Sequence, residues 1–266
     1  MRDRIRSALA GRYVLERELG RGASATVYSA RDLKHGRRVA LKVLDPAIAS
    51  TIGHERFLRE IRTTATLNHP HILPLFDSDE TDGFVFYTMP LVEGESLRDR
   101  MERSGPLPLD VVRKFTSQIA EALTAAHAAG VVHRDIKPEN ILVTAQDHVW
   151  VCDFGLARAL ASAIDGEASA AALIIGSPQY MSPEQASGRQ DVDKRSDVYS
   201  LGCTVFEMLA GTPPFSDQDA VSLLRRHLTE PPPSLSTLRE DVPSSVDLAL
   251  QQALAKSRDQ RFADAR

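Results

Sequence analysis

The sequence contains little of what a disulfide-rich, membrane-spanning or nucleic-acid-binding protein needs. Only two of its 266 residues are cysteine, Cys152 and Cys203, which is too few for a disulfide framework and agrees with a reducing compartment. No apolar run approaches the roughly 20 residues that span a bilayer, and the first residues lack the apolar core of a signal peptide. The formal net charge of -4 gives no long-range attraction to nucleic acid or anionic lipid. We therefore expect a cytoplasmic chain with no nucleic-acid partner and no membrane segment.

The composition is that of a globular protein. With 42% hydrophobic and 26% charged residues, the chain is large enough for two lobes that share one cleft. Short β-type runs separated by turn residues occupy the first third, at 13–19, 25–30, 39–44, 73–77 and 84–89. One predicted helix interrupts them, because apolar residues recur at helical spacing from Phe57 to Leu67. Beyond Gly94 the pattern predicts helices at 112–126, 198–209, 220–228 and 246–255, and therefore an α+β fold.

Two features of the strand-rich part suit a ligand that carries phosphates. The loop between the first two predicted strands contains Gly20 and Gly22, which would let the backbone close over phosphates. Taken alone, the loop is equally compatible with an ordinary tight hairpin. Lys42, on the third predicted strand, would place an ammonium group on the cleft side. Its expected partner is Glu60 on the predicted helix, with Glu55 as the alternative, and such a pair would aim Lys42 at the α- and β-phosphates.

The most informative segment runs from His133 to Asn140 and is followed, after a short predicted hairpin, by Asp153 and Phe154. A hydroxyl that attacks a γ-phosphate needs an acceptor for its proton, and the phosphates need a divalent metal held by oxygen ligands. Asp135 suits the first task, and Asn140 with Asp153 suits the second. We expect His133 to be a packed structural histidine, because Asp135 already has the role of the base.

Together these two segments resemble the catalytic loop and the metal loop of the protein kinase family. The resemblance covers about 13–262 and implies the bilobal protein kinase fold, with a β-rich N-lobe over 1–92 and a mostly helical C-lobe over 93–266. It implies ATP and Mg²⁺ as cofactors, with Mn²⁺ as an alternative ion. Asp135, Lys137 and Lys42 would be catalytic, with Lys137 neutralising charge on the γ-phosphate, and Asn140 and Asp153 would be the metal ligands.

The same resemblance places the adenine base against the predicted hinge at 89–94. Pro90 has no N–H there, but its carbonyl oxygen can accept, and Val92 can donate its N–H. Ala25 stands where the family has a third glycine, and its methyl group should stiffen the loop more than block it. The residues expected to contact the nucleotide are Leu19, Gly20, Gly22, Val27, Ala40, Lys42, Glu60, Met89, Pro90, Val92 and Leu142.

The acceptor side of the sequence is similar to that of serine/threonine kinases of the bacterial, eukaryotic-like type. Lys137 and the segment 176–184 carry this likeness, and the segment would form a platform for the peptide, with Ser177 touching the catalytic residues. Glu184 would pair with Arg261, and Asp197 would brace the catalytic loop. We expect a non-specific serine/threonine protein kinase that transfers the γ-phosphoryl group of Mg²⁺-ATP to protein serine or threonine hydroxyls in signalling.

A phosphorylation site is expected on the loop 157–175. Arg134 implies an anionic partner there, and only Ser162 and Ser169 carry hydroxyls. We predict that Ser169 is autophosphorylated in a transient homodimer, with Ser162 as the alternative site. The acidic residues Asp165 and Glu167 would partly replace the phosphate.

Two other functions agree with parts of the sequence. A pseudokinase would use the fold as a scaffold, but pseudokinases usually lose a lysine or aspartate at positions that Lys42, Asp135 and Asp153 fill here. A kinase of small molecules would tend to lack the platform at 176–184. Many relatives join the kinase domain to a transmembrane or sensor region, so the chain also agrees with the cytosolic domain of a larger, membrane-anchored protein.

Overall fold

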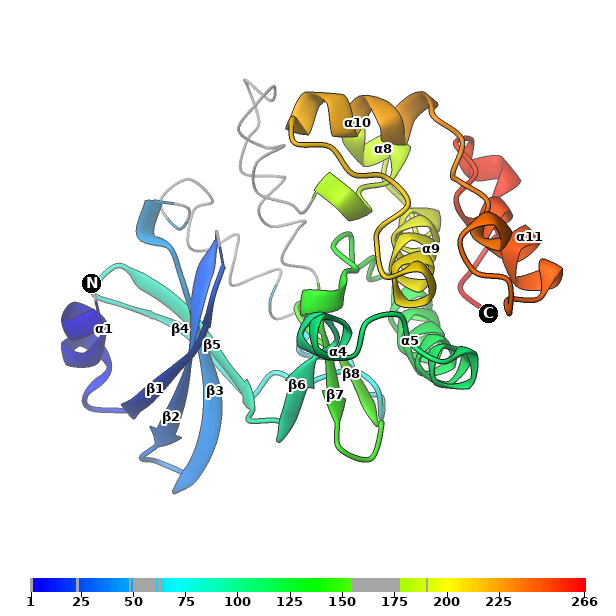
Figure 1. The fold of residues 1–266 in the computed structure, drawn as a ribbon. Coiled ribbons are helices and arrows are strands. Elements are labelled where there is room, and N and C mark those ends of the chain that lie inside the picture. Colours follow the sequence, from blue (N-terminus) through cyan, green and yellow to red (C-terminus); the bar gives the residue numbers. More distant parts are fainter. Residues whose placement is uncertain are drawn as a thin grey trace.

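The computed structural model describes residues 2–22, 24–47, 49, 61, 64–154, 178–189 and 191–266, which form two lobes (Figure 1). The N-lobe is a five-stranded antiparallel sheet in the order β1-β2-β3-β5-β4. Its strands are β1 (Tyr13–Arg21), β2 (Ala25–Asp32), β3 (Arg37–Leu44), β4 (Asp77–Thr81) and β5 (Phe84–Pro90). The predicted α+β class with a small β-rich lobe is therefore confirmed.

Two elements of this lobe differ from the sequence prediction. The strand predicted at 73–77 is wrong, because β4 begins only at Asp77. Its residues are mostly charged and only partly buried, as suits the edge of a sheet, and they show none of the apolar alternation on which the prediction relied. Helix α1 (Arg2–Leu9) was not predicted, because only Ile5 and Leu9 are buried in it, against one face of the sheet.

The C-lobe joins a small sheet to a group of helices. Its sheet contains β6 (Gly94–Ser96), β7 (Ile141–Thr144) and β8 (Val149–Val151). The helices are α4 (Leu97–Ser104), α5 (Leu109–Ala128), α8 (Pro183–Ala186), α9 (Arg195–Ala210), α10 (Ala220–Thr229) and α11 (Ser244–Ala253). Short 3-10 turns lie at η1 (Pro138–Asn140), η2 (Pro178–Tyr180), η3 (Leu235–Thr237) and η4 (Arg258–Gln260).

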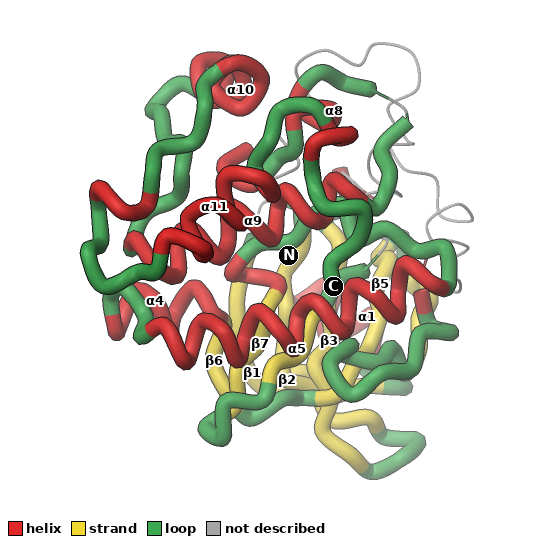
Figure 2. The backbone as a smooth tube through the Cα atoms, turned by 90° about the vertical axis from the view of Figure 1, so that its right-hand side faces the viewer, coloured by secondary structure: helices red, strands yellow, loops and turns green. Residues whose placement is uncertain are grey.

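Helix α9 is the centre of this lobe. Every residue from Ser196 to Leu209 is buried, so the helix has no solvent face, and Figure 2 shows it running alongside α5. The apolar stripe of α5, which includes Phe115, Ile119 and Leu123, packs in the same core as Val205 and Phe206 of α9. The four helices predicted beyond Gly94 are confirmed as α5, α9, α10 and α11. Of the helix predicted from Phe57 to Leu67, the structure describes only Ile61 and 64–67, where the Ala65 N–H donates to the Ile61 carbonyl oxygen over 2.8 Å; the rest, with Glu60, lies outside the described residues.

Among the described residues, backbone pairing fixes the chain to the C-lobe on either side of β4 and β5. Before β4, Ile72 forms a parallel bridge with Val151 of β8, and the Leu73 N–H donates to the Val151 carbonyl oxygen over 2.9 Å. After β5, Gly94 pairs with Thr144 in the small sheet. A Cβ atom at Gly94 would lie 2.4 Å from the Val143 carbonyl oxygen, so only glycine allows this approach.

Candidate active site

A largely shielded carboxylate at the junction of the lobes, that of Asp153, accepts two side-chain donors. Asp153 follows β8, and its Oδ2 lies 2.5 Å from Lys42 Nζ of β3. Its Oδ1 accepts from the Tyr87 hydroxyl of β5 over 2.6 Å. Lys42 and Tyr87 are direct partners in the β3–β5 register, so their side chains leave the same face of the sheet. The predicted strand thus brings Lys42 to one of the predicted metal ligands.

Charge and burial act against each other at this carboxylate. Burial alone would raise the pKa of Asp153, but the Lys42 ammonium and the two hydrogen bonds outweigh it, so the pKa lies below its ordinary value. Burial alone would lower the pKa of Lys42, and the charge of Asp153 reverses that as well. Burial and Asp153 both raise the pKa of Tyr87 well above 10, which keeps its hydroxyl protonated as a donor. The pair is therefore ionic, with a neutral phenol beside it.

The catalytic-loop residues lie within hydrogen-bonding distance of one another. Lys137 Nζ is 2.8 Å from Asp135 Oδ2. Asn140, in the turn η1, donates its side-chain amide to the Asp135 carbonyl oxygen at 2.8 Å and to Oδ2 at 3.0 Å. Pro138 opens the turn, where its missing N–H costs nothing. The loop thus presents a carboxylate with an ammonium and an amide beside it.

Asp197 of α9 supports this loop from below and has a fully buried side chain. Its carboxylate accepts the backbone N–H groups of His133 at 2.9 Å and Arg134 at 2.8 Å. His127 Nε2 lies 2.7 Å from the same carboxylate. These bonds hold Arg134 at φ 69, a left-handed conformation that costs a non-glycine residue about 1–2 kcal/mol. The predicted bracing role of Asp197 is confirmed.

His133 links the catalytic loop to the segment that carries the metal residue. It is fully buried, its Nε2 lies 2.9 Å from the Cys152 carbonyl oxygen, and its ring packs 4.5 Å from that of Phe154. The Cys152 N–H in turn donates to the Asn140 carbonyl oxygen over 3.0 Å. His133 is therefore a packed structural residue, as predicted. These bonds place Asn140 beside the segment that holds Asp153.

The residues predicted to contact the nucleotide include an apolar group, expected around the base, and the two glycines of the loop between β1 and β2. One apolar cluster contains Ala40 and Met89, both 6% exposed, with Val27, Val92 and Leu142 packed against it. Leu19 is 37% exposed and lies outside this cluster. A Cβ atom at Gly20 would meet nothing within 4 Å, and the Gly22 N–H donates to the Ala25 carbonyl oxygen over 2.9 Å, which closes a tight hairpin. Pro90 ends β5 and is partly buried.

The structure leaves several predicted positions undescribed. Glu60, the expected partner of Lys42, lies outside the described residues, as do Glu55, Ser177 and both candidate phosphorylation sites. Tyr87, in contrast, is a contact of the site that the sequence reasoning missed. The available signal was its place on a predicted strand that runs beside the Lys42 strand.

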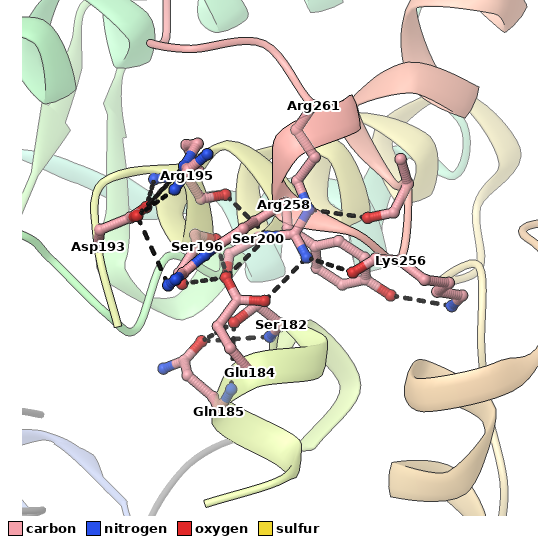
Figure 3. A network of polar contacts seen from close by, with 12 residues as sticks. Ser182, Glu184, Gln185, Asp193, Arg195, Ser196, Ser200, Lys256, Arg258 and Arg261 are labelled. Carbon is pink, nitrogen blue, oxygen red and sulfur yellow. Dashed lines mark hydrogen bonds and ion pairs between the residues drawn. The ribbon is translucent and has the colours of Figure 1, made fainter. Parts of the chain in front are cut away.

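The platform side of the site is fixed by a buried ion pair (Figure 3). Arg261 donates to both oxygens of Glu184, each over 2.8 Å, and Ser196 donates to the same carboxylate. Gln185, the next residue of α8, donates to the Arg134 carbonyl oxygen over 2.7 Å. The predicted pairing of Glu184 with Arg261 is confirmed. The Gln185–Arg134 bond connects the platform segment to the catalytic loop.

The residues present are suited to Mg²⁺ and a nucleotide. Mg²⁺ prefers hard oxygen ligands, and Asp153 supplies a carboxylate that is held ionised. Both bonds of the Asn140 side chain use its NH₂ group, which leaves the amide oxygen available to a cation. No helix in the described part of the chain is long and apolar enough to cross a bilayer.

Comparison with known proteins agrees with this geometry. Residues 13–263 match the protein kinase domain family. The chain is 40% identical over 257 residues to the serine/threonine-protein kinase PknD of Mycobacterium tuberculosis (strain CDC 1551 / Oshkosh), covering 96% of this chain and 38% of that protein. It is 39% identical over 259 residues to the serine/threonine-protein kinase PknB of Mycobacterium leprae (strain TN), covering 96% of this chain and 41% of that protein.

The chain therefore belongs to the protein kinase domain family, and the two curated relatives named above are mycobacterial serine/threonine-protein kinases. The resemblance seen in the sequence, and the serine/threonine class inferred from it, are confirmed. The chain spans about two fifths of the length of these relatives.

Proposed function

We propose that this domain transfers the γ-phosphoryl group of Mg²⁺-ATP to serine and threonine hydroxyls of proteins. The observation that supports this most directly is the catalytic loop, where Lys137 and Asn140 both contact the Asp135 carboxylate. Beside this loop, Asp153 on the segment after β8 pairs with Lys42 of β3, and both side chains are largely shielded from solvent. The division into an N-lobe over 1–92 and a C-lobe over 93–266, and the use of Mn²⁺ as an alternative ion, are part of the same proposal.

Each residue then has a separate task. Asp135 accepts a hydrogen bond from the attacking hydroxyl and orients it. Lys137, now paired with Asp135, neutralises charge that develops on the transferred group. Lys42 would hold the α- and β-phosphates, and Asn140 and Asp153 would hold the metal, which would neutralise phosphate charge when bound. Catalysis is mainly positioning and charge stabilisation, because the transferred group needs little covalent help from the protein.

We also propose that the domain acts in the cytoplasm and phosphorylates itself. Ser169, with Ser162 as the alternative, is the proposed acceptor, in a transient homodimer. The chemical support is the acceptor platform that ends at Glu184, held by Arg261.

The experiment is intact-mass measurement and phosphopeptide mapping after incubation with Mg²⁺-ATP, with and without myelin basic protein as a generic acceptor. The control is Asp135→Asn, with its fold checked by thermal unfolding. We expect phosphate on serine or threonine in the parent and at least a hundredfold less in the control. Equal phosphate on both proteins, or none on a parent that binds nucleotide, would refute the proposal.

A further inference from the structure

Tyr87 carries a polar group that the proposed mechanism does not use. It lies in β5, is 1% exposed, and packs in an apolar cluster with Ala40, Val85 and Met89. A hydroxyl in such surroundings costs stability unless it is hydrogen-bonded, so phenylalanine would be the simpler residue here. The hydroxyl is bonded to Asp153 Oδ1 over 2.6 Å. Its partner is thus one of the two proposed metal ligands.

The two donors to Asp153 bond to different oxygens of its carboxylate. Lys42 takes Oδ2 and Tyr87 takes Oδ1, and both donors come from paired positions of β3 and β5. The backbone of Asp153 has φ 67, so it lies in the left-handed region at the end of the small C-lobe sheet. Its side chain is therefore held from the other lobe, at both oxygens, by side chains whose spacing the sheet fixes.

The two donors differ in what else they must do. Lys42 is the proposed phosphate ligand, so a bound nucleotide draws its ammonium away from Oδ2. Tyr87 has no second task, and its hydroxyl stays on Oδ1. A hydrogen bond at Oδ1 would then restrain the rotation of the carboxylate and leave Oδ2 for a cation.

We propose that Tyr87 is a positioning residue of the metal site, whose hydroxyl fixes the Asp153 carboxylate so that one oxygen is presented to Mg²⁺. This rests on the proposed function. Removing an outer partner of a metal ligand typically weakens metal affinity about 10- to 100-fold. A donor also withdraws charge from the carboxylate, which weakens cation binding, but a neutral phenol withdraws little, so the loss of orientation decides the sign.

The test compares nucleotide binding with and without Mg²⁺ in the parent and in Tyr87→Phe. Calorimetry gives the affinity for a non-hydrolysable ATP analogue first in EDTA and then in Mg²⁺. The ratio of the affinity in Mg²⁺ to that in EDTA measures how much the metal contributes to nucleotide binding. The matched control is Tyr28→Phe. Tyr28 lies in the same sheet and is also 1% exposed, but it packs in the cluster on the opposite face.

We expect Tyr87→Phe to lower the Mg²⁺-dependent ratio about tenfold or more, with affinity in EDTA within about threefold of the parent. Tyr28→Phe should leave both affinities unchanged. A ratio equal to the parent's would overturn the inference in favour of a merely structural tyrosine. An equal loss of nucleotide affinity with and without Mg²⁺ gives this same unchanged ratio. A parent that shows no Mg²⁺-dependent binding would instead refute the proposed function. A second readout, the free Mg²⁺ concentration that half-saturates phosphoryl transfer, should rise by the same factor.

Discussion

Replacing Arg261 with alanine removes one partner of the buried ion pair that joins α8 to the C-terminal turn η4. The Arg261 side chain is 0% exposed and that of Glu184 is 5% exposed. Arg261 also donates to the carbonyl oxygens of Ala255 at 2.8 Å and Lys256 at 3.1 Å, so the variant loses more than the pair. The Glu184 carboxylate would remain buried with Ser196 as its remaining side-chain donor among those described.

The expected cost follows from this burial. Removing one partner of a buried pair costs about 3–5 kcal/mol, because the other charge stays buried without compensation. Stabilities of folded domains are about 5–15 kcal/mol, so Arg261→Ala should lose a large part of the total. For a chain of this size the melting temperature should fall by about 6 to 20 °C.

The pH dependence of the loss has a definite sign. Burial alone would raise the pKa of Glu184, but hydrogen bonds from Arg261 and Ser196 outweigh it and hold the pKa below its usual value. A carboxyl group whose folded pKa is lowered contributes stability above its unfolded pKa of about 4.3 and loses it as the pH falls through the folded value. The parent and Arg261→Ala should therefore differ most near neutral pH and converge in acid.

Urea unfolding followed by tryptophan fluorescence measures this difference. The chain has one tryptophan, Trp150, which lies in β8 of the C-lobe and reports on the lobe that holds the pair. The matched control is Arg258→Ala in the same turn, whose partner Asp191 is 52% exposed, so its loss should cost less than about 1 kcal/mol. If the two variants lost the same stability, burial would not be what makes the Arg261 pair important.

Two further results are expected. Burial, with the nearby Lys256 ammonium, lowers the pKa of His227 to about 4. Below about pH 6.5 the unfolded chain therefore binds a proton on His227 that the folded chain does not bind. The stability of the folded protein should therefore fall as the pH drops from 6.5 to 5. In His227→Gln, the urea midpoint should depend less steeply on pH over that range. A pH dependence equal to the parent's would contradict this. Asp197→Asn keeps only one acceptor oxygen, whereas the catalytic loop uses both oxygens of Asp197. In this variant kcat should fall at least tenfold, while KM for ATP stays within about threefold of the parent. Unchanged kinetics with a peptide substrate would count against the bracing role.

The parts of the site that could be predicted are those that the chain holds in short segments. Asp135, Lys137 and Asn140 lie within one loop, so their spacing already implies that the side chains meet. The apolar stripe that contains Phe115 gave the helix that leads into this loop, because packing in the core requires that spacing.

The parts that could not be predicted depend on the register between strands and on elements at the edge of the sheet or the lobe. The Tyr87–Asp153 bond joins residues 66 positions apart and needs both the β3–β5 register and the turn after β8. Strand β4 is stabilised by pairing with β5 rather than by apolar burial, so its residues carry no strand pattern. Helix α1 buries too few residues for a pattern to stand out.

The Ile72–Val151 bridge before β4 and the Gly94–Thr144 pairing after β5 fix to the C-lobe the two stretches of chain that flank these strands. Both lie at the ends of β4 and β5, which are neighbours at one side of the sheet, whereas β1 is at the opposite edge. A body held at two points rotates about the line between them, so we expect the N-lobe to move by a hinge rotation about this line rather than by shear. The glycine loop, carried by β1 and β2, then travels farthest. Asp153 directly follows strand β8, which the Ile72 bridge fixes, and should move least, so the cleft can open at its mouth while the end that carries the proposed metal ligand stays assembled.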